Sequence, residues 1–455
     1  MLFTVALWWG LFSGGAISAH AQGINILRDA ETEWFLNMIM EPIFIAAGLS
    51  PEAVTLYLVG DDELNAFVAM GQNIFINTGT IMKSDDVDEV LGVMAHETGH
   101  ITGGHDARPG DAAEGATAMS LITMLLGAAA LAAGAGDAGM ALLMGGQSMS
   151  QRIFLRNRRV WESAADQAAI TLLEATETSG KGLVRFFDRI RDQSLLTIRL
   201  QDPYVRTHPL TSERIARLEG RLTTSIYYDK PPDPYKQYWY ERIKAKLVGF
   251  TQPAYVTLRT YPESDQSMIA RYARIYAYNK DLQYERAISE AKRLAADFPD
   301  DPYFAEITGQ MLLENGHVSE ALPYYRTAVE LKPTEPLIMT YLGHALVASE
   351  DPALDDEAIE VLERVVFLEP KDGFAWRNLA VVYARNDRAA ETNLAMAELF
   401  ALQGQVRDSG RQARIAMDGL PKGSPKWIRA QDLTIYAQAE MEERGLEEGQ
   451  RPRRR

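Results

Sequence analysis

The chain has 455 residues, a formal net charge of −16 and no cysteine. Its length allows about three domains of ordinary size, and its negative charge argues against a nucleic acid partner, because phosphate binding needs basic patches. Without cysteine, disulfides, Cys-based zinc fingers and thiol nucleophiles are excluded.

The first 21 residues have the pattern of a secretory signal peptide. Residues 2–17 are uncharged and mostly apolar, and Ala19-His20-Ala21 has the small-x-small form of a cleavage site. The pattern departs from the rule in one respect, because no Lys or Arg precedes the apolar run. We expect residues 1–21 to be a signal peptide, with an uncleaved membrane anchor as the alternative.

A helix, a short sheet and a second helix are expected next. Apolar residues on one face of 28–45 predict the first helix. Residues 54–59, 65–68 and 73–77 read as strands. Ser84-Asp85-Asp86 offers an N-cap and an acidic first turn for the helix that follows. This order predicts an α+β domain over residues 22–222.

The second helix carries the motif His96-Glu97-Thr98-Gly99-His100. Residues four apart on a helix lie nearly above one another, so His96 and His100 point the same way and can bind one divalent metal. Glu97 lies between them and can act on a metal-bound water, whose pKa zinc lowers from about 15.7 towards 7. The motif predicts a zinc hydrolase. Together with the helix and short sheet before it, the motif helix gives the layout expected of an α+β zincin-type metallopeptidase domain over residues 22–222.

Two residues are candidates for a third metal ligand. Asp106 occupies the last place of the metzincin frame that starts at the motif, and His105 is one residue out of that frame. Glu162, on a later predicted helix, would complete a His-His-Glu site. Asp166, one turn further on, would orient a histidine ligand. A solvated helix face is the alternative for Glu162 and Asp166.

Four motifs, taken in order, resemble the gluzincin family that contains HtpX-like and BepA-like zinc peptidases. The first two are Asn65-Ala66-Phe67 and the HETGH motif. The others are Arg159-x-x-Glu162-x-x-x-Asp166 and the stretch from Thr207-His208-Pro209 to Ile215. The resemblance covers about residues 28–222, and the leader and the helical repeats favour BepA-like members.

The resemblance implies the metal site. His96, His100 and Glu162 would bind one Zn²⁺ ion, and Glu97 would be the general base. Asp166 would orient a metal-binding histidine without itself binding the metal.

The resemblance also implies two further roles. Asn65, Ala66 and Phe67 would lie on the active-site edge strand, where a peptide adds as another strand. His208 would sit at the metal and plug it, with capping of the following helix as the alternative.

Two uncharged runs, 115–136 and 138–150, separate the HETGH motif from Glu162. The first run is long enough to span a bilayer, but it is rich in Ala and Gly. We expect residues 115–150 to form an apolar helical lid or a hairpin that contacts a membrane surface, with a membrane span or plain core as alternatives. The arginines that follow are expected either to lie near anionic lipid head groups or to have a structural role; they are Arg152, Arg156, Arg158 and Arg159.

The C-terminal half is expected to be an all-α tetratricopeptide-repeat solenoid over residues 268–440. Ala287, Ala321 and Ala358 each precede a proline by twelve residues, and small and aromatic residues recur in the repeat positions. Such helix pairs need neighbours, so four or five are expected. Residues 223–267 read as a connector with a short helix over 238–248, and residues 441–455 as a disordered basic tail.

These features together predict an exported zinc endopeptidase, and the resemblance implies that it works in the periplasm. The resemblance implies that it hydrolyses unfolded or misassembled envelope and outer-membrane proteins, and that its repeats recruit substrates or dock on the outer-membrane assembly machinery. The alternative is a chaperone or adaptor with little proteolysis. The role of Glu97 separates the two, because an adaptor would keep its cellular role without that base.

Overall fold

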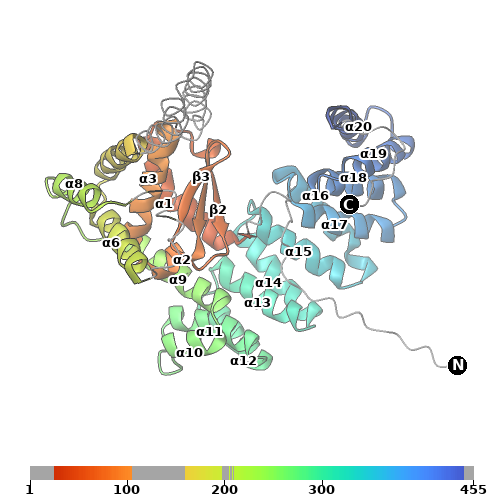
Figure 1. Ribbon diagram of the computed structural model, residues 1–455. Coiled ribbons are helices and arrows are strands. Elements are labelled where there is room, and N and C mark those ends of the chain that lie inside the picture. Colours follow the sequence, from red (N-terminus) through yellow and green to blue (C-terminus); the bar gives the residue numbers. More distant parts are fainter. Residues whose placement is uncertain (1–24, 105–158, 197–203, 205–207, 209, 445–455) are drawn as a thin grey trace, which may run out of the picture. The chain divides into compact units, whose positions relative to one another are not determined.

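The computed structural model describes residues 25–104, 159–196, 204, 208 and 210–444. The predicted signal peptide and the 115–150 region lie outside the described residues, as does the tail beyond 444. The chain divides into two compact units (Figure 1). The first holds Asn25–Leu27 and Glu31–Thr251, and the second holds Arg28–Ala30 and everything from Gln252 onward.

The first unit contains a four-stranded mixed sheet with the order β1-β2-β4-β3. Its strands are β1 (Ile26–Leu27), β2 (Thr55–Val59), β3 (Ala66–Ala69) and β4 (Asn73–Asn77). β2 and β4 are parallel, whereas β1 and β3 run antiparallel to their neighbours. β3 is therefore an edge strand of this sheet.

Helices surround the sheet and form one apolar core with it. The core draws Phe35 and Ile39 from the first helix, Ile74 and Ile76 from β4, and Met94 from the motif helix, all buried. The helices are α1 (Ala30–Ala46), α2 (Thr78–Lys83), α3 (Val87–Thr102), a helix over residues 159–175, α6 (Lys181–Leu196), α8 (Ser212–Leu222) and α9 (Pro234–Thr251), with a short 3-10 turn at Pro51–Ala53.

The helix α9 differs from the short helix predicted in the connector. It begins at Pro234, where a missing N–H costs nothing in the first helical turn, and the Asp233 carboxylate accepts from the N–H groups of Tyr235 and Lys236, both at 3.0 Å. Tyr240 and Ile243 are fully buried in the core of the first unit. The boundary between the units therefore lies at 251/252, inside the predicted connector.

The second unit is all-helical in the residues described, which confirms the predicted tetratricopeptide-repeat fold. A short helix, α10 (Ala254–Thr260), precedes the repeats. Consecutive helices then pack in pairs, α11 (Met268–Lys280) with α12 (Tyr284–Asp297), α13 (Pro302–Glu314) with α14 (Val318–Leu331), α15 (Pro336–Ala348) with α16 (Asp355–Leu368), α17 (Gly373–Arg385) with α18 (Ala389–Leu402), and α19 (Val406–Gly419) with α20 (Pro425–Glu443).

The turns inside successive pairs repeat one backbone conformation. Leu282, Gly316, Glu350 and Asp387 each have a positive φ, between 55° and 82°. The repeated alanines, Ala287, Ala321 and Ala358, are all fully buried. The regular left-handed residue reverses the chain at the same place in each pair.

The C-terminal helix α20 extends beyond residue 440, the predicted end of the solenoid. It continues through Glu443, so the first residues of the predicted tail 441–455 are helical. Met441 is buried against Val406 and Ala437, which explains why the helix persists. Among the residues described, no helix is both long and apolar enough to cross a membrane.

Candidate active site

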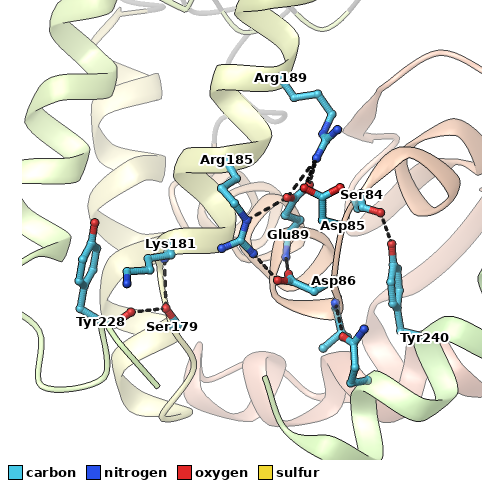
Figure 2. A network of polar contacts seen from close by, with 12 residues as sticks. Ser84, Asp85, Asp86, Glu89, Ser179, Lys181, Arg185, Arg189, Tyr228 and Tyr240 are labelled. Carbon is cyan, nitrogen blue, oxygen red and sulfur yellow. Dashed lines mark hydrogen bonds and ion pairs between the residues drawn. The ribbon is translucent and has the colours of Figure 1, made fainter. Parts of the chain in front are cut away.

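The helix α3 is fixed at its start by α6 (Figure 2). Asp86 caps the helix by accepting from the Glu89 N–H at 3.1 Å. Arg185 of α6 donates to Glu89 at 3.0 Å and to Asp86 at 2.5 Å. Arg189 of the same helix pairs with Asp85 at 2.7 Å. Charged side chains of α6 therefore hold the acidic first turn of α3.

The helix α9 holds the same end of α3 from another side. Gln237 accepts from the Val87 N–H at 3.0 Å, and the Tyr240 hydroxyl donates to the carbonyls of Ser84 and Ile81 at 2.5 and 3.1 Å. Figure 2 shows Tyr240 reaching Ser84. The direction in which α3 leaves its cap is thus set by two neighbouring helices.

Gly99, inside the HETGH motif, lets the helix over 159–175 approach α3 closely. A Cβ at this position would lie 2.8 Å from the Ala165 carbonyl oxygen and 3.0 Å from its Cα. A larger residue would push the two backbones apart. Because Glu162 lies one turn before Ala165, the absence of a side chain at Gly99 brings that carboxylate to the histidines.

Four side chains meet at this crossing. Each of His96, His100, Glu162 and His208 offers one nitrogen or oxygen atom, and these atoms lie within 4.8 Å of one another. The two Nε2 atoms of His96 and His100 are 3.2 Å apart, and the Glu162 oxygens lie 3.5 and 3.6 Å from them. His208 Nδ1 lies 3.1 and 3.2 Å from the same carboxylate.

Glu97 lies beside this cluster and is fully buried. The Nε2 atom of His208 lies 3.6 Å from its Oε1. Within the described residues, neither carboxylate oxygen has a hydrogen-bond partner. Burial raises the pKa of Glu97 above its usual value. A buried carboxylate in this state suits a proton acceptor for a water molecule held nearby.

Asp166 stands behind His96. Its Oδ1 is 3.1 Å from His96 Nδ1, the ring nitrogen on the side away from the cluster. Arg214, on α8, donates to both oxygens of Asp166 at 2.7 Å and lies 2.8 Å from Glu162. A carboxylate at the second nitrogen of a histidine ligand fixes the orientation and the tautomer of the ring.

The buried charges fit a divalent cation. Three buried carboxylates, Glu97, Glu162 and Asp166, face one buried guanidinium, that of Arg214. Their formal sum, −3 + 1, is −2. Burial lowers the pKa of His96, but hydrogen bonds to Asp166 and Glu162 outweigh it and raise that pKa to about 9. The cluster thus attracts positive charge, and its nitrogen and oxygen donors are those that zinc accepts.

An aromatic wall lies behind His208. The ring of Tyr204 stacks on the imidazole with centroids 4.5 Å apart and an interplanar angle of 23°. Phe186 and Phe187 of α6 contact Tyr204 at 5.5 and 6.2 Å. Phe187 also meets the edge of His96 at 5.8 Å and lies under the Arg214 guanidinium at 4.9 Å.

Sequence reasoning missed two residues of this site. Arg214 belongs to the His-Pro stretch that carried the resemblance, but it received no role. Tyr204 was not considered, although its place one helical turn before His208 was a usable signal; the His208 N–H donates to the Tyr204 carbonyl at 2.6 Å. Asp106 and His105, the metzincin alternative, lie outside the described residues.

The strand predicted to receive substrate lies at the sheet edge. The Asn77 N–H donates to the Asn65 carbonyl at 3.0 Å across β4 and β3, so this opposed pair is hydrogen-bonded. Because such pairs alternate along an antiparallel ladder, the backbone groups of Ala66 and Val68 point away from β4. Phe67 stacks on Phe75 at 4.9 Å. The side chain of Ala66 is fully buried.

Comparison with known proteins agrees with this geometry. Residues 30–222 match the model of peptidase family M48, and residues 272–336 match a tetratricopeptide repeat. The chain is 24% identical over 376 residues to the beta-barrel assembly-enhancing protease of Yersinia pestis, covering 80% of this chain and 76% of that protein. It is 25% identical over 361 residues to the protein of the same name from Escherichia coli K12, covering 77% of this chain and 71% of that protein.

Residues 30–222 form a peptidase domain of family M48, and the chain as a whole is similar to the beta-barrel assembly-enhancing proteases, that is, BepA-like. This confirms the family resemblance and the two-part fold predicted from the sequence. A protein described as a putative beta-barrel assembly-enhancing protease from Vibrio cholerae is also 25% identical over 389 residues, 83% of this chain and 78% of that one. The M48 match spans every described residue of the candidate site in this BepA-like peptidase. The crystal structure of YrrB, a tetratricopeptide-repeat protein, matches at 18% identity and a TM-score of 0.32, covering 38% of this chain and 91% of YrrB.

Proposed function

We propose that this BepA-like peptidase is a zinc endopeptidase of the gluzincin type. The observation that carries the proposal is the meeting of His96, His100 and Glu162 within 4.8 Å, from two separate helices. Glu162 supplies the third ligand in this scheme, in preference to Asp106. A zinc ion held there supplies a Lewis acid that makes water nucleophilic near neutral pH.

The residues of the chain divide the remaining work. Glu97 accepts the proton of the attacking water and then returns it to the leaving amine, because it is buried beside the cluster with no competing hydrogen bond within the described residues. Asp166 keeps the Nε2 of His96 directed at the cluster. Ala66 and Val68 hold the peptide by backbone hydrogen bonds along the sheet edge.

In the resting enzyme, His208 closes the site. Its contacts at 3.1 and 3.2 Å with Glu162 support this role, since a zinc hydrolase needs an exchangeable position for water and substrate. A protease that meets unfolded proteins benefits from a latent state. Stabilisation of the transition-state oxyanion is the second role that His208 could fill.

The names of the relatives support a role in the cell envelope. Beta-barrel assembly-enhancing proteases carry that role in their name. We extend it to this chain as an exported, periplasmic enzyme that cleaves unfolded or misassembled outer-membrane proteins. The repeats would recruit substrates or contact the assembly machinery, and residues 115–150 would touch the membrane surface. A second function, as a chaperone or adaptor with little proteolysis, remains the competing proposal because the repeats form a large separate unit.

Substitutions at three acidic residues test the proposal. Glu97→Gln should retain the metal and lose cleavage of an unfolded protein, and Glu162→Gln should lose the metal. Asp106→Asn should change neither. Metal content is measured by mass spectrometry, and cleavage with casein. Loss of metal from Asp106→Asn with retention in Glu162→Gln would establish the metzincin arrangement, and a cellular phenotype rescued by Glu97→Gln would favour the adaptor.

A further inference from the structure

His208 is held by a second residue that the proposed chemistry does not use. Tyr204 is fully buried, and its ring lies nearly parallel to the imidazole, with centroids 4.5 Å apart. The contact covers one face of the His208 ring along its length. Glu162 and Glu97 meet the two ring nitrogens at its edge, and the rings of His96 and His100 lie 5.4 and 5.1 Å from it.

The Tyr204 ring has a rigid support. Phe186 meets it edge-on at 5.5 Å and 89°, and Phe187 lies 6.2 Å away. Both phenylalanines are fully buried on α6. The arginines of α6 on either side of them, Arg185 and Arg189, bind the first turn of α3 (Figure 2). One helix therefore fixes both the start of the motif helix and the wall behind Tyr204.

The backbone ties the two rings together as well. The His208 N–H donates to the Tyr204 carbonyl at 2.6 Å. For the His208 ring to leave Glu162, it must lose the stacked contact with Tyr204. The stack thus adds to the free energy that keeps His208 in the cluster.

We propose that Tyr204 is a positioning residue that holds His208 against Glu162 and so sets how often the active site is open. This inference rests on the proposed closing role of His208. Tyr204 acts through the imidazole on which its ring is stacked. A stacked aromatic pair contributes about 0.5–1.5 kcal/mol beyond burial, which corresponds to a roughly 2- to 12-fold shift in the closed-to-open ratio.

The central experiment replaces the ring by an aliphatic side chain in the full-length, zinc-loaded protein. Tyr204→Leu should raise the rate of casein cleavage about 2- to 12-fold. The same variant should release zinc faster to a chelator, by a similar factor, since His208 no longer covers the site. Tyr204→Phe keeps the ring and should restore both wild-type rates.

Two controls separate this role from general loosening. Trp34→Leu removes another aromatic contact of the same unit, with Trp239 at 4.5 Å, and should change neither rate. In a His208→Ala background, Tyr204→Leu should give no further increase, because the two residues act through one contact. An unchanged or lower rate in Tyr204→Leu, additive effects in the double variant, or a changed rate in Tyr204→Phe would each overturn the proposal.

A third arm keeps this inference distinct from the proposed function. Glu97→Gln should abolish cleavage in both the wild-type and the Tyr204→Leu background. Cleavage that survives Glu97→Gln would reject the proposed zinc mechanism itself. Loss of cleavage in Glu97→Gln, together with no gain in Tyr204→Leu, would reject only the positioning role of Tyr204.

Discussion

Arg214 donates two parallel hydrogen bonds to Asp166, from Nε to Oδ2 and from Nη2 to Oδ1, each of 2.7 Å. The two residues are 48 positions apart and both are buried. Asp166 in turn faces His96 Nδ1 at 3.1 Å. The guanidinium thereby fixes the carboxylate that orients a proposed metal ligand.

We expect Arg214→Met to weaken zinc binding about 10- to 100-fold, the usual cost of losing a group that supports a metal ligand. Arg214→Lys should not restore it, because an ammonium cannot form the forked pair. Arg217→Met is the matched control, since Arg217 lies on the same helix with a largely exposed side chain. Competition with a zinc indicator measures the affinity, and equal affinities for Arg214→Met and Arg217→Met would contradict the prediction.

Removal of His208 tests whether the site rests closed. His208→Ala should raise casein cleavage while the metal content stays that of the wild type, because the position that His208 occupies at the cluster is then open to water and substrate. The measurement is the initial rate with metal content checked in the same sample. A fall in kcat of about 10² would instead assign His208 to oxyanion stabilisation, and an unchanged rate would leave it a capping residue.

Asp88, in the first turn of α3, should make the first unit less stable as the pH rises. Burial, and secondly the charge of Asp86, raise the pKa of Asp88 to about 7 from an ordinary 3.8. The folded state therefore binds more protons than the unfolded state between pH 4 and pH 7, so the stability contributed by Asp88 is present below pH 4 and is lost as the pH rises through 7.

Asp88→Asn removes this dependence. Relative to the wild type, the variant should gain stability at pH 8 on the order of 2–4 kcal/mol and gain little at pH 4. Thermal or urea unfolding of both proteins at the two pH values gives the difference, in which the other titrating groups cancel. A variant that is equally destabilised at both pH values would show that Asp88 is ionised without penalty in the folded protein.

Leu282 occupies a turn where the next helix pair has a glycine. Its φ is 60°, whereas Gly316, at the same place in the next pair, has φ 82°. A left-handed conformation costs a side-chain-bearing residue about 1–2 kcal/mol, and glycine loses roughly 0.5–1 kcal/mol of chain entropy. Leu282 is 70% exposed and loses little packing on truncation.

Leu282→Gly should therefore stabilise the repeat unit by roughly 0.5–1 kcal/mol. Gly316→Leu is the reciprocal variant and should destabilise it by a similar amount. The urea midpoint of the helical signal reports both. Stabilisation by both changes, or by neither, would show that the backbone of these turns relaxes and carries no strain.

Much of this protein follows from local patterns in the sequence. The spacing of His96 and His100 depends only on helix geometry, and the period of the alanines from Ala287 onward depends only on the repeat of one helix pair. Strand and helix positions in the first unit were predicted within a few residues, because alternation and N-cap residues act within one element. The full extent of α9 was not predicted, because it depends on contacts that α9 makes in the core of the first unit with residues far away in the sequence.

Only the tertiary structure brings the site together. Glu162, His208 and Arg214 reach His96 from three later segments, through the close approach at Gly99 and the crossing of separate helices. No local pattern states which acidic residue of a helix faces inward, nor that Tyr204 stacks on His208. The reason is physical: a helical period specifies the direction of a side chain within its own element, whereas the partner it meets depends on how whole elements pack.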